Sequence, residues 1–179
     1  AVTGQVLPIL VCYEHSQETL LHRLICQESV DDPESREPVG VTRAEIEKAV
    51  LDYYDHRRDS RESGRLDFGW ILNRIPSAER AWFRMRDYLD RMWLVYGDGL
   101  ETTIDYLYEY VRMAQLMGHH RVMLIVDYAQ RVPIRPSVGY LELNEMQRID
   151  LIMRGLKGIA RRQHRQLDAA VPGDAGVDR

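Results

Sequence analysis

The residue whose type and position most clearly suggest chemistry is Asp127, which ends an apolar stretch. Five apolar residues, 122–126, follow the polar segment Gly-His-His-Arg at 118–121. This pattern is typical of a strand buried on both faces, as in a parallel sheet. Ligands of such sheets bind outside the carboxyl ends of the strands, so Asp127 could offer a carboxylate to a phosphate-bound Mg²⁺. The pattern alone also fits an aspartate that ends a strand and caps a turn.

Strand and helix patterns alternate along the chain and predict an α/β domain around this carboxylate. Apolar residues in helix 17–28 form a one-sided stripe that we expect to lie on the sheet. Thr42 and Glu45 have the spacing of a capping box, whereas residues 56–64 are typical of a solvated linker. Gly118 is expected to end a helix. Strands are predicted at 6–13, 93–96 and 122–127, and helices at 17–28, from 42, from 77, from 102 or 103, and from about 141 to about 163.

Composition describes an ordinary soluble chain. A length of 179 residues suits one domain, and 45% hydrophobic residues, 29% charged residues and a net charge of −4 give no global signature for nucleic acid or membrane. No apolar run is long enough to span a bilayer, and no signal-peptide pattern is present. Cys12 falls in a predicted strand and Cys26 in a predicted helix, which favours buried free thiols in a reducing compartment. We therefore expect a cytoplasmic protein.

Four segments, taken in order, resemble the RecA-like motor domain of DnaB-type replicative helicases. The family has a strand ending in a Ser-Leu-Glu-Met-like turn, with Glu14 here in the place of its glutamate, and a strand ending Asp-Tyr-x-Gln. The resemblance implies an incomplete RecA-like three-layer α/β fold over residues 1–166, with a mainly parallel sheet flanked by helices. An irregular tail would follow at 167–179. The four segments are ILVCYEHSQETLLHRLICQES (9–29), WLVYGDGLETTIDYLYEYVRMA (93–114), LIVDYAQ (124–130) and RIDLIMRGLKGIA (148–160).

The resemblance implies ATP and Mg²⁺ as cofactors and assigns roles to single residues. Glu14 would be the general base that orients the attacking water, although its position alone also fits an exposed glutamate favoured near a helix N-terminus. Asp127 would hold Mg²⁺ through water, and Gln130 would lie near the nucleotide. Residues 131–140 occupy the place of the family's channel loop, which implies that Arg131 and Arg135 contact the phosphates of single-stranded DNA.

The chain lacks some motifs of the family, and these differences determine which activity we expect of the isolated chain. No G-x-x-x-x-G-K-[ST] motif is present, and residues from 166 onward match neither the family's Ser-Gln strand nor its arginine-finger region. The family has its phosphate loop before the first strand seen here. We therefore expect this loop upstream of Ala1, and we expect the isolated chain to hydrolyse ATP poorly or not at all. Loss of the helix that follows the loop should leave apolar sheet surface uncovered.

The intact protein would form a homo-oligomeric ring, expected to be a hexamer, whose adjacent subunits share each nucleotide. Two alternatives stay open. The chain could be a degenerate RecA-fold module that contacts DNA or protein without ATPase activity. It could also belong to a RadA-like or KaiC-like ATPase, although the Asp-Tyr-x-Gln strand end and the Leu-Lys pair in the last helix favour the DnaB type.

Overall fold

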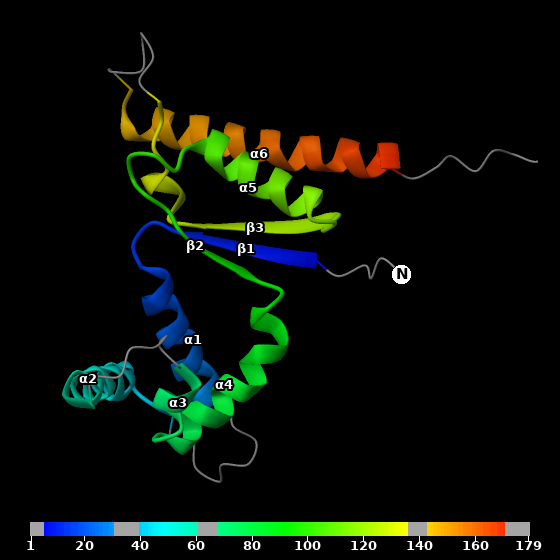
Figure 1. The fold of residues 1–179 in the computed structure, drawn as a ribbon. Helices are drawn as coiled ribbons and strands as arrows, with labels where there is room; N and C mark the ends of the chain where they lie inside the picture. Colours follow the sequence, from blue (N-terminus) through cyan, green and yellow to red (C-terminus); the bar gives the residue numbers. More distant parts are fainter. Residues whose placement is uncertain (1–5, 31–39, 61–67, 136–142, 171–179) are drawn as a thin grey trace, which may run out of the picture. The chain divides into compact units, whose positions relative to one another are not determined.

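The structure, a computed structural model, describes residues 6–30, 40–60, 68–135 and 143–170. The chain divides into two compact units, and each is described by itself. The sheet unit comprises Ala1–Glu14 and Val95–Arg179, and the helical unit comprises His15–Leu94. The expected α/β class is observed, with a three-stranded sheet in the order β2-β1-β3 (Figure 1). The strands are β1 (Val6–Cys12), β2 (Trp93–Tyr96) and β3 (Arg121–Asp127).

The core of the sheet unit is built on two parallel neighbouring strands, β1 and β3. Helix α5 (Ile104–Leu116) packs on β3, and α6 (Glu145–Ala170) lies beside α5 on the same side of the sheet (Figure 1). Side chains alternate between the two faces of a strand, so every second residue of β1 is buried in this core. The buried residues are Leu7, Ile9 and Val11 of β1, and Leu107, Val111 and Ala114 of α5.

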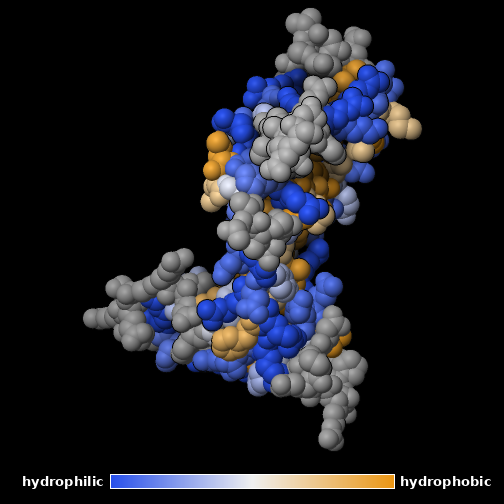
Figure 2. All heavy atoms as spheres, turned by 90° about the vertical axis from the view of Figure 1, so that its right-hand side faces the viewer, coloured by the Kyte–Doolittle hydropathy of each residue, from blue (hydrophilic) through white to orange (hydrophobic). Residues whose placement is uncertain are grey.

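The prediction that the strand ending at Asp127 is buried on both faces is wrong. Along β3 exposed residues alternate with half-buried ones; Met123 is 50% exposed and Ile125 is 40% exposed. Their partners in register, Pro8 and Leu10, are only half-buried. The reason is that α5 and α6 lie on one side of the sheet. The exposed side chains of Met123 and Ile125 therefore leave apolar surface on the other face of the sheet. Figure 2 shows one side of the molecule, where hydrophobic residues (orange) lie at the surface among hydrophilic ones.

The helical unit consists of α1 (Gln17–Val30), α2 (Arg43–Ser60), α3 (Phe68–Leu72) and α4 (Pro76–Leu89). Helix α1 packs chiefly on α4. The α1 stripe was expected to lie on the sheet, and its Ile25 belongs to an apolar cluster with residues of α4 such as Met85. Within the helical unit the amphipathic α4 therefore covers part of this stripe.

Several predicted helix boundaries are confirmed in atomic detail. The Thr42 hydroxyl accepts a hydrogen bond from the Glu45 backbone N–H at 3.3 Å, and the Glu45 carboxylate accepts one from the Thr42 N–H at 2.7 Å. These two bonds are the reciprocal pair that defines a capping box. Gly118 adopts a φ of 93° immediately beyond α5, which is the left-handed conformation expected of a helix-ending glycine.

The largest differences from the predicted boundaries are at the ends of α2 and α6. Helix α2 continues to Ser60, so the first half of the predicted linker 56–64 is helical, and residues 61–64 lie outside the described residues. Helix α6 continues to Ala170, into the predicted irregular tail, whose remainder also lies outside the described residues. Of the helices in the described ranges, none combines the length and the apolar character needed to cross a membrane.

His22 is a buried titratable group in the helical unit. Its side chain is 3% exposed and stacks on the Phe68 ring with a centroid separation of 5.8 Å. Its Nε2 atom has no hydrogen-bond partner among the described residues. Burial lowers the pKa of His22 below its ordinary value, an effect that the nearby carboxylates of Glu18 and Glu47 oppose. The folded state therefore favours the neutral imidazole.

This burial predicts a pH-dependent stability. Because the pKa of His22 is lower in the folded chain, the unfolded chain binds more protons as the pH falls through the ordinary histidine pKa of about 6.5. The stabilisation is therefore fully present above that pH and is lost as the pH falls below it. We expect the urea midpoint of the wild-type chain to fall between about pH 7.5 and about pH 5, and to fall less in His22→Leu. An equal fall in both proteins would contradict this assignment.

Candidate functional site

The candidate site lies at the sheet edge where β1 and β3 both end. Cys12 is paired in register with Asp127, and the Tyr13 backbone N–H donates to the Asp127 carbonyl oxygen at 2.7 Å. Glu14 follows directly. Because the strands are parallel, the carboxylates of Glu14 and Asp127 belong to the same edge of the sheet. Both residues are exposed. We call this pair the carboxylate edge.

Tyr13 fixes the chain that leads into Glu14. Its side chain is buried, and its hydroxyl donates to the Thr102 carbonyl oxygen at 2.6 Å. Burial raises the pKa of Tyr13 above its ordinary value, which keeps this donor protonated. The Gly97 N–H donates to the Cys12 carbonyl oxygen at 2.8 Å, and a Cβ on Gly97 would lie 2.8 Å from the Tyr13 ring. A glycine is therefore needed where this loop crosses the tyrosine.

Asp127 is held by a buried thiol. Cys12 is fully buried, and its Sγ donates to Oδ2 of Asp127 at 3.7 Å. A thiol is a weak donor, so this contact contributes to the orientation of the carboxylate. The peptide bond that follows Asp127 is cis. Both cysteines are free thiols, as predicted; Cys12 is buried and Cys26 is half-buried.

The carboxylate edge suits a metal that is held mainly by a substrate. Among the described residues, no three histidine, cysteine, aspartate or glutamate side chains are grouped so that they could hold a metal ion. Mg²⁺ in phosphate-transfer sites keeps several waters and needs only one or two protein carboxylates beside the phosphates. Asp127 fits such a single ligand, and Glu14, which is exposed to water, fits a general base.

The three remaining predicted site residues fall into two places. Gln130 and Arg131 belong to the short 3₁₀ helix η1 (Ala129–Arg131), directly after the carboxylate edge, and both are exposed. Fully buried Val132 anchors the chain after η1. Arg135 instead lies beside the start of α5, where its Nη1 is 3.7 Å from Oδ2 of Asp105. The rest of the predicted DNA loop, residues 136–140, lies outside the described residues.

Sequence reasoning missed the residues that support the carboxylate edge. Cys12 and Tyr13 looked like ordinary strand residues, and only the register of β1 against β3 places the thiol at Asp127. Asp98 was also missed. Its carboxylate accepts from the N–H groups of Leu100 and Glu101 at 2.6 and 3.1 Å, which shapes the turn before α5. The Asp-Gly pair at 98–99 is a signal that could have indicated this turn.

Comparison of the chain with protein-family models, curated proteins and solved structures gives no match. Any functional assignment therefore rests on the motifs of the sequence and on the geometry of the carboxylate edge.

Proposed function

We propose that this chain is part of the motor domain of a DnaB-type, ATP-dependent DNA helicase with a RecA-like fold. The observation that supports this most is the parallel pairing of β1 with β3. The pairing brings Glu14 and Asp127, which are far apart in sequence, to one sheet edge. Phosphoryl transfer to water needs a metal-binding carboxylate and a water-orienting group at the same site.

In this proposal the two carboxylates have different tasks. Asp127, oriented by the Cys12 thiol, holds the Mg²⁺ of the bound nucleotide through water. Glu14 orients the attacking water and accepts its proton. The Tyr13 anchor fixes the backbone beside Glu14, because general-base catalysis depends on hydrogen-bond reach to the water. Gln130, in the 3₁₀ helix η1 that follows Asp127, lies near the nucleotide in this proposal.

The segment after the carboxylate edge connects hydrolysis to DNA in this proposal. Arg131 is exposed and only four residues after Asp127, so it suits a contact with a DNA phosphate. Arg135 is the weaker of the two candidates, because its guanidinium already forms an ion pair with the Asp105 carboxylate at 3.7 Å. In a hexameric ring each nucleotide would lie between adjacent subunits, and successive hydrolysis would move these segments along single-stranded DNA.

The proposal is tested by strand displacement with the intact gene product on a forked DNA duplex. We expect unwinding that requires ATP and Mg²⁺, and ATP hydrolysis that single-stranded DNA stimulates. The 179-residue chain alone should hydrolyse ATP at background rates, because it carries no phosphate-binding loop motif. An intact gene product that binds DNA but neither hydrolyses ATP nor unwinds would contradict the proposal and favour the non-hydrolysing module.

A further inference from the structure

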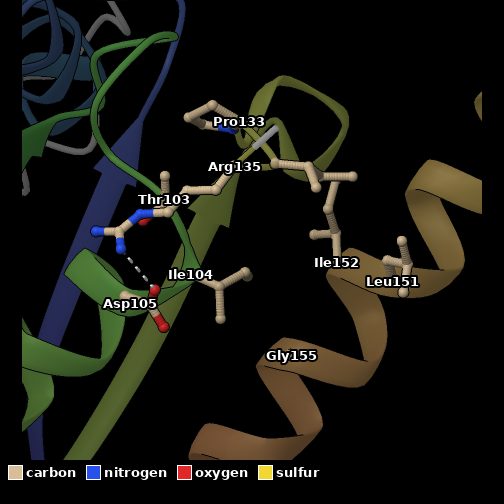
Figure 3. Close-up of a pocket in the computed structure, with 9 residues that line it drawn as sticks. Thr103, Ile104, Asp105, Pro133, Arg135, Leu151, Ile152 and Gly155 are labelled. Carbon is tan, nitrogen blue, oxygen red and sulfur yellow. Dashed lines mark ion pairs between the residues drawn. The ribbon is translucent and has the colours of Figure 1, made fainter. Parts of the chain in front are cut away.

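Helix α6 has an apolar stripe that packs in the core of the sheet unit, where α6 lies against α5 and η1. The buried residues of this stripe are Ile152 and Ile159. Ile152 and Ile104 of α5 extend into the space between the two helices (Figure 3). Gly155 lets the helices approach, because a Cβ at this position would lie 2.8 Å from Cγ2 of Ile104. This stripe accounts for the packing of α6 on α5.

A second apolar stripe of α6 lies at the surface, about a quarter of a turn around the helix from the first. Its residues follow one another at alternating spacings of three and four, which is the a/d pattern of a coiled coil. Met146 is 77% exposed and Met153 is 43% exposed, and Ala160 is also exposed. We call this stripe the α6 seam. Its residues are Met146, Ile149, Met153, Leu156 and Ala160.

The α6 seam ends before Gln163, which would be its next position. The Nε2 of Gln163 donates to the Val122 carbonyl oxygen at 3.3 Å, so this side chain belongs to the contact between α6 and the sheet. The seam therefore covers residues 146–160, about 22 Å of helix. Contiguous apolar surface of this kind marks interaction sites, whereas single exposed apolar residues do not.

The charges beside the α6 seam indicate what covers it. Asp150 and Lys157 each follow a seam residue directly, so they lie on the same edge of the seam, one heptad apart. Both are exposed. A two-fold axis perpendicular to two antiparallel helices keeps the same edge of each helix together. A second α6 that runs antiparallel would therefore bring Asp150 of each copy to Lys157 of the other.

We propose that the α6 seam is a contact between two copies of this chain, in which the two α6 helices pack antiparallel about a two-fold axis. Met153 of each copy then packs against Leu156 of the other copy, close to the axis. Asp150 and Lys157 form two ion pairs along one edge. A two-fold contact closes at two chains, so it is separate from the head-to-tail contact that builds a ring.

The length of the α6 seam sets the strength of this contact. A pair of helices that meet over about 22 Å buries less surface than the standard protein interface of about 1,600 Å². We therefore expect a weak, reversible dimer with a Kd of about 10–500 µM.

Sedimentation equilibrium of the 179-residue chain, over a concentration range that spans this Kd, is the first test. We expect a reversible equilibrium between monomer and dimer. A chain that stays monomeric over the whole range would overturn the proposal. Assemblies larger than a dimer would overturn it as well, because a two-fold contact cannot add a third copy.

Met153→Glu tests the position of the contact, since it places like charges near the two-fold axis and should raise the Kd by at least about tenfold. Met123→Glu is the matched control. Met123 is 50% exposed, similar to Met153, but it belongs to β3 on the open face of the sheet. The control should keep the wild-type Kd. Loss of the dimer in Met123→Glu, or a wild-type Kd in Met153→Glu, would overturn the proposal. Circular dichroism of the dilute variants reports whether the fold is intact.

Asp150→Lys and Lys157→Asp test the antiparallel orientation. Each variant alone brings like charges together and should raise the Kd about three- to tenfold. In an equal mixture of the two variants, each lysine faces an aspartate again, so the mixture should associate about as tightly as the wild type. Asp150 also pairs with Arg154 at 2.7 Å, but this ion pair is exposed, so its loss should change the stability of the chain little. A mixture no tighter than either variant alone would contradict the antiparallel arrangement.

Discussion

Replacing Asp127 with asparagine should reduce Mg²⁺-dependent ATP hydrolysis by the intact gene product by a factor of about 10² to 10⁴. Asparagine keeps the shape of the side chain and can still accept from the Cys12 thiol, which lies 3.7 Å from Oδ2. It loses the negative charge that, in the proposed function, binds the metal. The measurement is the steady-state ATPase rate as a function of Mg²⁺ concentration. We expect the residual activity to need more Mg²⁺.

Glu14→Gln should lower kcat by a similar factor with little change in the KM for ATP, because a general base acts mainly in the transition state. The different responses of Glu14 and Asp127 to Mg²⁺ would separate their two roles. Glu109→Gln is a suitable control, because Glu109 is an exposed carboxylate whose partner is Arg112 on the same helix. Wild-type rates in both Asp127→Asn and Glu14→Gln would show that the carboxylate edge is not a hydrolytic site.

Gly155→Ala and Gly158→Ala, three residues apart on α6, should change stability in opposite directions. A Cβ at 155 would lie 2.8 and 3.0 Å from two carbons of Ile104, whose β-branched side chain is stiff. We expect this overpacking to cost about 1–3 kcal/mol, which exceeds the gain in helix propensity. At 158 the nearest atom is 3.8 Å away, so alanine should stabilise the protein by about 0.5–1 kcal/mol.

Urea unfolding followed by circular dichroism measures both effects under one set of conditions. Adding Ile104→Ala to Gly155→Ala provides an internal check, because removal of the Ile104 branch should relieve the clash. The two changes together should then cost less than the sum of their separate costs. Equal stabilisation of the chain by both glycine substitutions would contradict the close approach of α6 to the start of α5.

Local patterns predicted the elements, but not what each buried face contacts. The apolar run at 122–126 correctly predicted the strand that ends at Asp127, yet it could not show that α5 and α6 lie on one side of the sheet. In the same way, the stripe of α1 showed that one helix face is buried without specifying α4 as a partner. Both contacts concern tertiary packing, which periodicity in a single segment does not encode.

The candidate site also combines features that could be predicted from the sequence with contacts that could not. Parallel strands end at one edge, and the family resemblance together with the strand patterns predicted that Glu14 and Asp127 share an edge of the sheet. The Cys12 thiol contact with Asp127 depends on strand register, and the Tyr13 hydroxyl donates to the carbonyl oxygen of Thr102, which is 89 residues away in sequence. Such contacts join residues from distant parts of the chain, and no spacing within a segment indicates them.

The central claim, that this chain is part of an ATP-driven DNA motor, is tested most directly by reading the coding DNA upstream of the Ala1 codon in frame. We expect a glycine-rich segment ending in Gly-Lys-Ser or Gly-Lys-Thr, which would cradle the phosphates of the nucleotide beside Glu14 and Asp127. A start codon at that place with no such segment would contradict the claim. The two carboxylates would then be remnants in a binding module that does not hydrolyse ATP.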